Sequence, residues 1–429
     1  MHLLLSTTPI PAHTLNAAAF AAACAAAGDT VTWHAPRRFH DAIAALGAEP
    51  VDVEAAWDPD RDSGGVPVMG SLAQVRRGYA DHIVGRAEGR ARDVLRIIER
   101  TSPDIVLADT LAYGAGLAAQ VAGLPWATYG DGPLHDRDPD TPPFGSGLPY
   151  RTGATYRRRN AVVHYVSDLV FAESARSLQM SRTRLGLPPE RGAVLAAGVC
   201  PDLHLQGGVP ALEYPRRLPT PPGIHFLGSL YRRPPGTAVP AWCADLGRDG
   251  RPVVAITQGS LRRDVAELIA PTVRAMADEE CTLVVAAGSE RGARQVRAIP
   301  TGRASVYAAA YVPYDALVAE ASVFVTNGGW TGVTTALAHG VPVLQVGQTE
   351  EKADIGRRIE WSGCGLSLRR GRRTPARIRR AIRDIRDDPA IAAGVARVAA
   401  EFAVRDAGTQ GAALLCAHAA RTTPTKGRQ

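Results

Sequence analysis

Lysine is almost absent from this sequence. Lys352 and Lys426 are the only two, although lysine and arginine together number 49 in a chain of 429 residues. Arginine therefore carries the formal net charge of +7, a bias that a GC-rich genome explains better than selection for an anionic partner. The densest basic stretch, Arg369 to Arg386, is expected to be a solvated helix face, with weak attraction to a membrane surface or an anionic acceptor as the alternative. Because lysine is so rare in this chain, Lys352 is a candidate functional residue.

The six cysteines include no Cys-x-x-Cys pair. Their scatter argues against a zinc site, a redox pair and a disulfide framework, so we expect buried thiols. No Asp-x-Asp arrangement stands in a plausible loop and no His, Cys and Asp residues cluster along the chain, so we expect neither a metal nor a cofactor. A P-loop and a Gly-x-Gly-x-x-Gly fingerprint after the first apolar run are also missing, which counts against ATPases and NAD-dependent enzymes.

Long apolar runs are missing as well. No stretch reaches the roughly 18 apolar residues of a membrane-spanning helix, and no basic region precedes the first apolar segment, so we expect a cytoplasmic protein. A chain of 429 residues is too long for one ordinary core. We predict an N-terminal domain over residues 1–210, a linker over 211–223, a second domain over 224–388, C-terminal helices over 389–421 and a disordered tail over 422–429.

Apolar runs and helical patterns alternate in both halves of the chain. Leu3 to Thr7 predicts a strand, followed by a loop that contains His13 and by an Ala-rich helix that closes at Gly28. Asp104 to Asp109 predicts a buried strand that ends in a carboxylate, and Val253 to Thr257 opens a second alternating series. This alternation predicts an α/β protein with two Rossmann-like domains that face each other across a cleft.

The stretch from Ser322 to Leu368 organises the second half. An apolar run ends at Asn327-Gly328-Gly329, and a helical segment begins at once at Trp330. The backbone N–H groups of such a helix N-terminus form a ready site for an anion. A second apolar run gives way to Gln348-Thr349-Glu350-Glu351-Lys352, whose side chains can hydrogen-bond a polyol. A phosphate group and a sugar can therefore bind next to each other where these two predicted strands end.

This stretch resembles the donor-sugar signature of the GT-B glycosyltransferases that use nucleotide-diphosphate sugars, particularly the bacterial branch of the UDP-glycosyltransferase superfamily that decorates macrolides and other natural products. The likeness rests on the glycine pair, the segment Ala336 to Pro342 and the glutamine followed by an acidic pair. It implies the GT-B fold, a nucleotide-diphosphate sugar as co-substrate, catalysis without a metal, and a final helix that crosses back, so that residues 389–421 pack on the first domain.

His13 is the candidate catalytic base. It stands beside a predicted helix N-terminus, which disfavours the imidazolium and leaves a neutral ring that can take a proton. Pro11-Ala12-His13 also occupies the place of the family's catalytic histidine, with Ala12 where glycine is usual; the alternative is a histidine that caps the helix or bonds within the loop. Asp109 matches the family's aspartate that orients this histidine, and its alternative is a cap for the helix near Gly114.

Two strand–helix turns, Gly259-Ser260 and Gly328-Gly329, are predicted to aim two helix N-termini at the leaving diphosphate. Asn327 stands where the family frequently has histidine, so backbone dipoles and Arg262 or Arg263 would supply more of the stabilisation; otherwise Asn327 only adopts a left-handed turn. The predicted donor site comprises Gly259, Ser260, Tyr311, Val312, Asn327, Gly328, Gly329, Trp330, Thr331, Glu351 and Lys352.

The nucleotide base and the sugar have separate candidates. Tyr311 falls where the family places a tryptophan that stacks on the base, and Val312 can read the base edge through its main chain; a core or rim tyrosine is the alternative. Glu351 keeps the acidic sugar-binding position, or complements a helix dipole. Lys352 replaces glutamine with a donor-only cation, which makes a deoxysugar a fair alternative to an ordinary hexose. Thr335 replaces the ribose-binding glutamate, so UDP and TDP are not distinguished.

Together these features predict an inverting glycosyltransferase that moves a hexose or deoxyhexose to a hydroxyl of a small lipophilic natural product, with inversion implied by the resemblance. The acceptor pocket is expected between the segment Gly130 to Pro149 and the helix after Leu72. Two alternatives stay open: a GT-B enzyme of the nucleotide-sugar 2-epimerase kind, and a non-catalytic helper protein that has lost donor binding. No nucleic-acid partner is expected, and the oligomeric state is not predicted.

Overall fold

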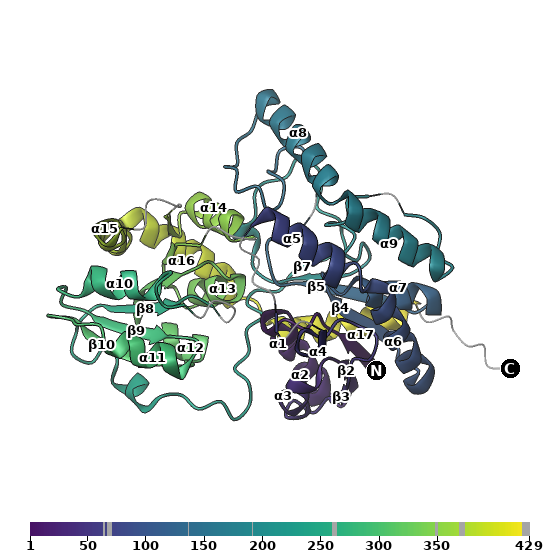
Figure 1. The fold of residues 1–429 in the computed structure, drawn as a ribbon, viewed down its shortest axis with the longest axis horizontal. Coiled ribbons are helices and arrows are strands. Elements are labelled where there is room, and N and C mark those ends of the chain that lie inside the picture. The colour runs from purple at the N-terminus through teal and green to yellow at the C-terminus, as the bar shows by residue number, and fades with distance from the viewer. Residues whose placement is uncertain are drawn as a thin grey trace.

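The computed structural model describes residues 1–62, 65–66, 71–135, 137–190, 192–259, 264–347, 351–368 and 374–422. Within them the chain forms two α/β units, each built on a parallel sheet, and Figure 1 shows the units side by side. The predicted α/β class with two Rossmann-like domains is confirmed. In the described chain, no helix combines the length and the apolar character needed to cross a membrane.

The N-terminal sheet has seven strands in the order β3-β2-β1-β4-β5-β6-β7. Successive residues of β1 enter cores on opposite faces, because Leu3 and Leu5 pack in one cluster and Leu4 in another. Such two-sided burial is typical of parallel strands covered by helices. The strands are β1 (His2–Ser6), β2 (Thr30–His34), β3 (Glu49–Val51), β4 (Ile105–Asp109), β5 (Trp126–Gly130), β6 (His204–Gln206) and β7 (Ile224–Phe226).

Helices of the N-terminal unit differ from the prediction at two places. The helix expected after the first loop is two helices, and the first of them already contains His13, because Pro11 suits the first helical position. The helical pattern after Leu72 is broken by a π-helical turn at Tyr79–Ile83. The helices are α1 (Pro11–Asn16), α2 (Ala18–Ala26), α3 (His40–Ala44), α4 (Pro59–Asp62), α5 (Leu72–Gly78), α6 (Ala87–Thr101), α7 (Tyr113–Ala122), α8 (Ala154–Val170) and α9 (Ala172–Arg184).

The second sheet has six strands in the order β10-β9-β8-β11-β12-β13, all parallel. The strands are β8 (Val253–Thr257), β9 (Thr282–Ala286), β10 (Ser305–Ala309), β11 (Ala321–Thr326), β12 (Val343–Gln345) and β13 (Gly365–Ser367). The helices that accompany them are α10 (Ile269–Met276), α11 (Glu290–Arg297), α12 (Tyr314–Val318), α13 (Trp330–Ala338), α14 (Lys352–Ser362) and α15 (Pro375–Asp387).

Two domain boundaries differ from the prediction. Strand β7 (Ile224–Phe226) pairs with β6, so the N-terminal sheet extends past the predicted linker. Helix α16 (Pro389–Ala403) contributes Val395 and Val398 to the core of the second unit, whereas α17 (Ala407–Thr422) packs against α2 and contributes Leu415 to the core of the first. The sequence of β7 or α16 indicates that one face of the element is buried, but it does not indicate which unit covers that face.

Candidate active site

Three neighbouring strands of the N-terminal sheet end at one edge. The chain leaves β1 into α1 and presents His13, β4 ends at Asp109, and Asp131 follows β5 directly. This edge is where open parallel sheets bind ligands. The sequence analysis identified His13 and Asp109 but missed Asp131, because a Pro-, Gly- and Asp-rich segment begins there. The available signal was its position immediately after a strand.

The ring of His13 lies between two carboxylates. Its Nδ1 atom is 3.1 Å from Oδ1 of Asp131 and 3.4 Å from Oδ1 of Asp109. Nδ1 is buried and aligned for a hydrogen bond with neither carboxylate, so both contacts are ionic. The side chain as a whole keeps 19% exposure. The open edge of the ring is therefore the one away from Nδ1, on which Nε2 can take a proton.

Asp109 is held by backbone donors. The N–H groups of Thr8 and Leu111 both donate to its carboxylate, at 2.5 and 2.9 Å. Helix α7 begins only at Tyr113, with Ala112 as its N-cap residue and no side-chain cap. The alternative in which Asp109 caps this helix is therefore wrong. Its carboxylate instead joins the β1–α1 loop to the end of β4 and faces His13.

Charge outweighs burial at this site. Burial lowers the pKa of His13, but Asp131 and Asp109 overcome that effect and raise it well above 6.5. Burial raises the pKa of Asp109, yet His13, the N–H of Thr8 and Arg90 bring it below its usual 3.8. The expectation of a neutral ring in the free protein is therefore wrong. Helix α1 has six residues, and the partial charge at its terminus is weaker than two full charges at ion-pair distance.

In the second unit, β11 leads through Asn327-Gly328-Gly329 into α13. Gly328 has a φ of +98°, and a Cβ there would lie 2.8 Å from Cγ of Gln345, so the turn requires glycine. The backbone of Asn327 has no positive φ, and its Nδ2 donates to the carbonyl of Gln258 at 2.5 Å. The left-handed alternative for Asn327 is therefore wrong. Its amide instead ties the end of β11 to the end of β8.

The start of α13 faces the first unit. Its N-cap, Gly329, has no side chain to cap the first N–H groups, which suits an anion at the helix terminus. Trp330 donates from Nε1 to the carbonyl of Gly207 at 2.9 Å, and Thr331 accepts a hydrogen bond from Nδ2 of Asn16 at 3.0 Å. Both side chains thus join the units, and Figure 1 shows α1 and α13 together at the junction.

The other predicted donor residues that the structure describes lie in several segments of the second unit. Gly259 has a φ of +79° and lies beside the amide of Asn327, while Ser260, Arg262 and Arg263 lie outside the described residues, as do Gln348, Thr349 and Glu350. Tyr311 is half exposed and Val312 is buried. The Oγ1 of Thr335 donates to the carbonyl of Thr331 at 2.7 Å, so this hydroxyl is engaged within the helix.

Glu351 and Lys352 stand at the start of α14. Glu351 is the N-cap residue without a side-chain cap. The Nζ of Lys352 lies 3.8 Å from Oε1 of Glu351, and its aliphatic chain passes Gly347, where a Cβ would be 3.0 Å from Cδ of the lysine and 1.7 Å from the carbonyl oxygen of Asn327. The structure therefore brings the predicted sugar-binding lysine beside the predicted phosphate-binding turn.

Helix α14 also holds the segment predicted to wall the acceptor. The carboxylate of Asp354 accepts hydrogen bonds from the N–H groups of Gly145 and Gly147, the latter at 2.7 Å. Arg357 donates from Nε to the carbonyl of Gly147 at 3.0 Å. Arg358 forms a buried ion pair with Glu213 at 3.0 Å. One helix thus begins at a predicted donor-site residue and also binds the backbone of the segment from the first unit.

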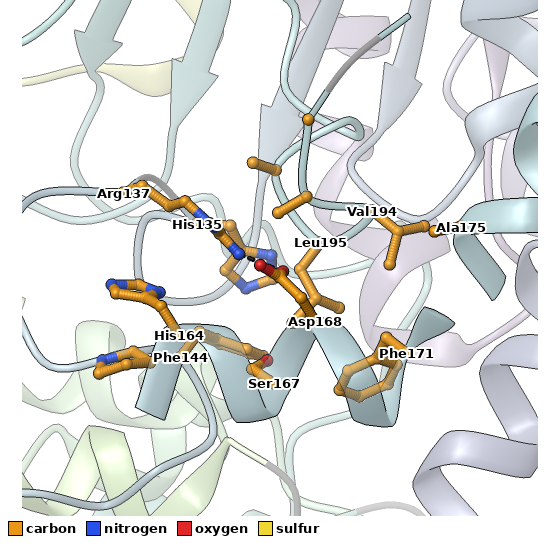
Figure 2. Close-up of a pocket in the computed structure, with 14 residues that line it drawn as sticks. His135, Arg137, Phe144, His164, Ser167, Asp168, Phe171, Ala175, Val194 and Leu195 are labelled. Atoms are coloured by element: carbon orange, nitrogen blue, oxygen red, sulfur yellow. Dashed lines mark hydrogen bonds and ion pairs between the residues drawn. The ribbon is translucent and has the colours of Figure 1, made fainter. Parts of the chain in front are cut away.

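A cavity of about 270 Å³ opens between this segment and α8 (Figure 2). Its described lining includes Phe144, Phe171 and Leu195, and an ion pair joins Arg137 to Asp168. The ring of His135 lies 3.8 Å from that of Phe144, and burial lowers its pKa to about 3, so it is neutral there. Helix α8 lines this cavity, and the described lining includes no residue of the helix after Leu72. Among the described residues no group of three His, Cys, Asp or Glu could hold a metal ion.

Known proteins resemble this chain in sequence and in fold. Residues 272–416 match the family described as erythromycin biosynthesis protein CIII-like, C-terminal domain. The chain is 33% identical over 417 residues to 4'-demethylrebeccamycin synthase of Lentzea aerocolonigenes, covering 94% of this chain and 96% of that protein. It is 30% identical over 334 residues to UDP-glycosyltransferase 2 of Phaeomoniella chlamydospora, covering 73% and 72%. The solved structure of glycosyltransferase VinC in complex with DTDP matches 98% of this chain and 100% of that one, with a TM-score of 0.70 and 20% identity.

Two parallel-sheet units and the likeness to these proteins define a glycosyltransferase of the GT-B fold that depends on a nucleotide sugar. The likeness to 4'-demethylrebeccamycin synthase covers 94% of this chain and shows to which branch of these enzymes the chain belongs. The chain belongs to the natural-product glycosyltransferases of the UDP-glycosyltransferase superfamily, the family that contains 4'-demethylrebeccamycin synthase.

Proposed function

We propose that this protein transfers a hexose or deoxyhexose, with inversion, from a nucleotide-diphosphate sugar to a hydroxyl of a small lipophilic natural product. The observation that carries the proposal is the placement of His13. Its Nδ1 faces two carboxylates, its opposite edge is open, and α13 begins across the junction. A proton acceptor and an anion site therefore face each other, as a single displacement requires.

In the proposed reaction, Nε2 of the deprotonated His13 takes the proton of the acceptor hydroxyl. The hydroxyl oxygen forms a bond to C1 of the sugar as the bond from C1 to the diphosphate oxygen breaks, and the electron pair leaves with the diphosphate. Asp109 orients the ring through Nδ1 and stabilises the imidazolium that forms. The N-terminus of α13 stabilises the charge that develops on the leaving group.

We place the sugar at the start of α14 and the acceptor toward the cavity under α8. Glu351 can accept hydrogen bonds from sugar hydroxyls, whereas Lys352 can only donate. The apolar lining of the cavity suits a lipophilic aglycone. One relative is named for UDP and one structural neighbour was solved with DTDP, so uridine and thymidine diphosphate sugars are the donors to test. We place the activity in the cytoplasm.

Substitution of His13 tests the chemistry. His13→Ala should lower kcat by about 10²–10⁴-fold, because it removes the general base, while the affinity for the nucleotide diphosphate stays near that of the unmodified protein. Turnover and calorimetric titration measure the two quantities. Glu54, an exposed carboxylate outside the site, offers a control as Glu54→Ala with full activity. Undiminished turnover of His13→Ala would refute the mechanism.

The same titration separates the two alternatives. A non-catalytic helper would bind none of a panel of nucleotides and nucleotide sugars. An enzyme of the 2-epimerase kind would convert the donor without any acceptor, which chromatography of the sugar nucleotide detects. The proposed transferase binds the donor and consumes it at a rate that depends on the acceptor.

A further inference from the structure

Asp131 connects the candidate base to the second unit. One oxygen, Oδ1, faces Nδ1 of His13 at 3.1 Å, and the other, Oδ2, lies 3.5 Å from Nδ2 of Asn16. The same Asn16 amide donates to Oγ1 of Thr331 at 3.0 Å. Asn16 is buried, and the side chain of Asp131 is 6% exposed. A chain of three side-chain contacts therefore runs from the histidine ring to the first turn of α13.

The two carboxylates beside His13 are held differently. Asp109 is fixed by backbone N–H groups of its own unit, those of Thr8 and Leu111. Asp131 contacts side chains, His13 on one side and Asn16 on the other. Since Asn16 also bonds to Thr331, the orientation of Asp131 depends on where α13 lies, whereas that of Asp109 does not.

We infer that Asp131 is a positioning residue for His13, and that Asn16 and Thr331 bring its carboxylate into place only when α13 lies against α1. The inference rests on the proposed function, because it needs His13 to be the base. It makes activation of the acceptor depend on the donor-binding unit being docked. A docked α13 gives the ring its second carboxylate, and a withdrawn α13 leaves it with Asp109 alone.

The charged and titratable groups around the ring come from several elements. Asp109 ends β4 and Asp131 follows β5, while Arg90 of α6 donates to the carbonyl of Thr7 at 2.8 Å. Tyr129 donates its hydroxyl hydrogen to the carbonyl of His13, and the partly exposed His135 interacts electrostatically with His13. Loss of one carboxylate from this set lowers the basicity of His13, since an adjacent opposite charge typically shifts a pKa by about 1–3.

Asp131→Asn tests the role of the carboxylate. At saturating donor, kcat/KM for the acceptor should rise with pH about 1 unit earlier than in the unmodified protein, because the ring releases its proton more easily. The plateau above that rise should be about 10-fold lower, because a less basic ring is a weaker base. Asp140→Asn, in the same segment but paired with Arg157 at 3.4 Å, is the matched control and should leave the pH profile unchanged.

Thr331→Val and Asn16→Ala test the link between the units. Each should shift the rise of kcat/KM toward lower pH by less than Asp131→Asn does. The double variant Asp131→Asn with Thr331→Val should shift it no further than Asp131→Asn alone, because both changes act through one contact chain. Additive shifts would show that Thr331 does not act through Asp131 and would overturn the link.

The outcomes also distinguish this inference from the proposed function. An inactive His13→Ala together with an unshifted Asp131→Asn would overturn the inference and keep the base. Undiminished turnover by His13→Ala would overturn both. Thermal unfolding and nucleotide affinity, measured on every variant, identify any loss of fold. If Asp131→Asn does not fold, the pH profiles of Asn16→Ala and Thr331→Val decide, and unshifted profiles in both would overturn the inference.

Discussion

At the scale of single residues, burial and neighbouring charges have opposite effects on the pKa of His13. Burial alone would leave the ring neutral, as the sequence analysis expected from a nearby helix terminus, but Asp131 and Asp109 reverse this. The residue types of the pair could be predicted, since a histidine after the first strand and an aspartate at the end of β4 carry the resemblance. The protonation state could not, because it depends on Asp131, which is 118 positions away along the chain and meets His13 only through the order of the strands.

The raised pKa of His13 fixes the direction of the pH dependence. Because the pKa is above 6.5, the ring stays protonated at mildly acidic pH and cannot act as a base there. We expect kcat/KM to rise with pH through this pKa, with the midpoint above pH 6.5. Initial rates across a series of buffers, with the donor saturating, measure it. A profile that is flat or falling between pH 6 and pH 8 would contradict the assignment of His13 as base.

At the scale of elements, the segment from β11 to α13 was the most predictable part of the chain. Asn327-Gly328-Gly329 between an apolar run and a helical pattern indicated a turn and a helix terminus, and the structure has α13 beginning at Trp330. The contacts of the first side chains of α13 could not be predicted from the sequence. Trp330 and Thr331 are predicted donor-site residues, and their side chains also contact Gly207 and Asn16. The free N–H groups of a helix N-terminus point out along the helix axis, whereas the side chains point away from that axis.

The glycine pair offers a matched test of this turn. Gly328→Ala should destabilise the protein by about 1–2 kcal/mol from the left-handed backbone alone, with a further cost from the Cβ that would lie 2.8 Å from Gln345. It should also weaken nucleotide binding, because α13 starts at this turn. Gly329→Ala should leave the melting temperature close to that of the unmodified protein, since φ is −65° and no atom lies within 4 Å of the new Cβ. Equal melting temperatures for both variants would contradict this account.

At the scale of the whole molecule, the fold class and the pair of Rossmann-like units followed from the alternation of strands and helices. The boundary did not, because β7 and α16 each present an apolar face that either unit could cover. The contacts between the units were also out of reach. Asp354 reads as an ordinary helix residue, yet its carboxylate binds the backbone of Gly145 and Gly147 from the other unit. Such contacts depend on how two finished units meet.

The hydrogen bonds from Gly145 and Gly147 to Asp354 predict that a change at Asp354 weakens acceptor binding and leaves nucleotide binding largely unchanged. Asp354→Ala removes two hydrogen bonds to a charged acceptor, each worth about 1.5–3 kcal/mol, and releases the segment that lines the cavity. We expect KM for the acceptor to rise about 10-fold or more, while the dissociation constant of the nucleotide changes little. Steady-state kinetics and calorimetry measure the two. Asp384→Ala, an exposed carboxylate of α15, is the control. A weaker nucleotide affinity with unchanged acceptor KM would contradict the prediction.

The near-absence of lysine has a practical consequence for following occupancy of the site. The N-terminal amine is engaged by Asp29, and Lys352 is the sole lysine in the described part of the chain, with Lys426 the other lysine of the sequence. Only 10% of the Lys352 side chain is exposed, so an amine-acylating reagent meets one slowly reacting internal amine inside the described fold, at the start of α14 beside the proposed sugar position. The mass of one acyl group on the peptide that contains Lys352, compared with and without a nucleotide sugar, reports directly whether that position is filled.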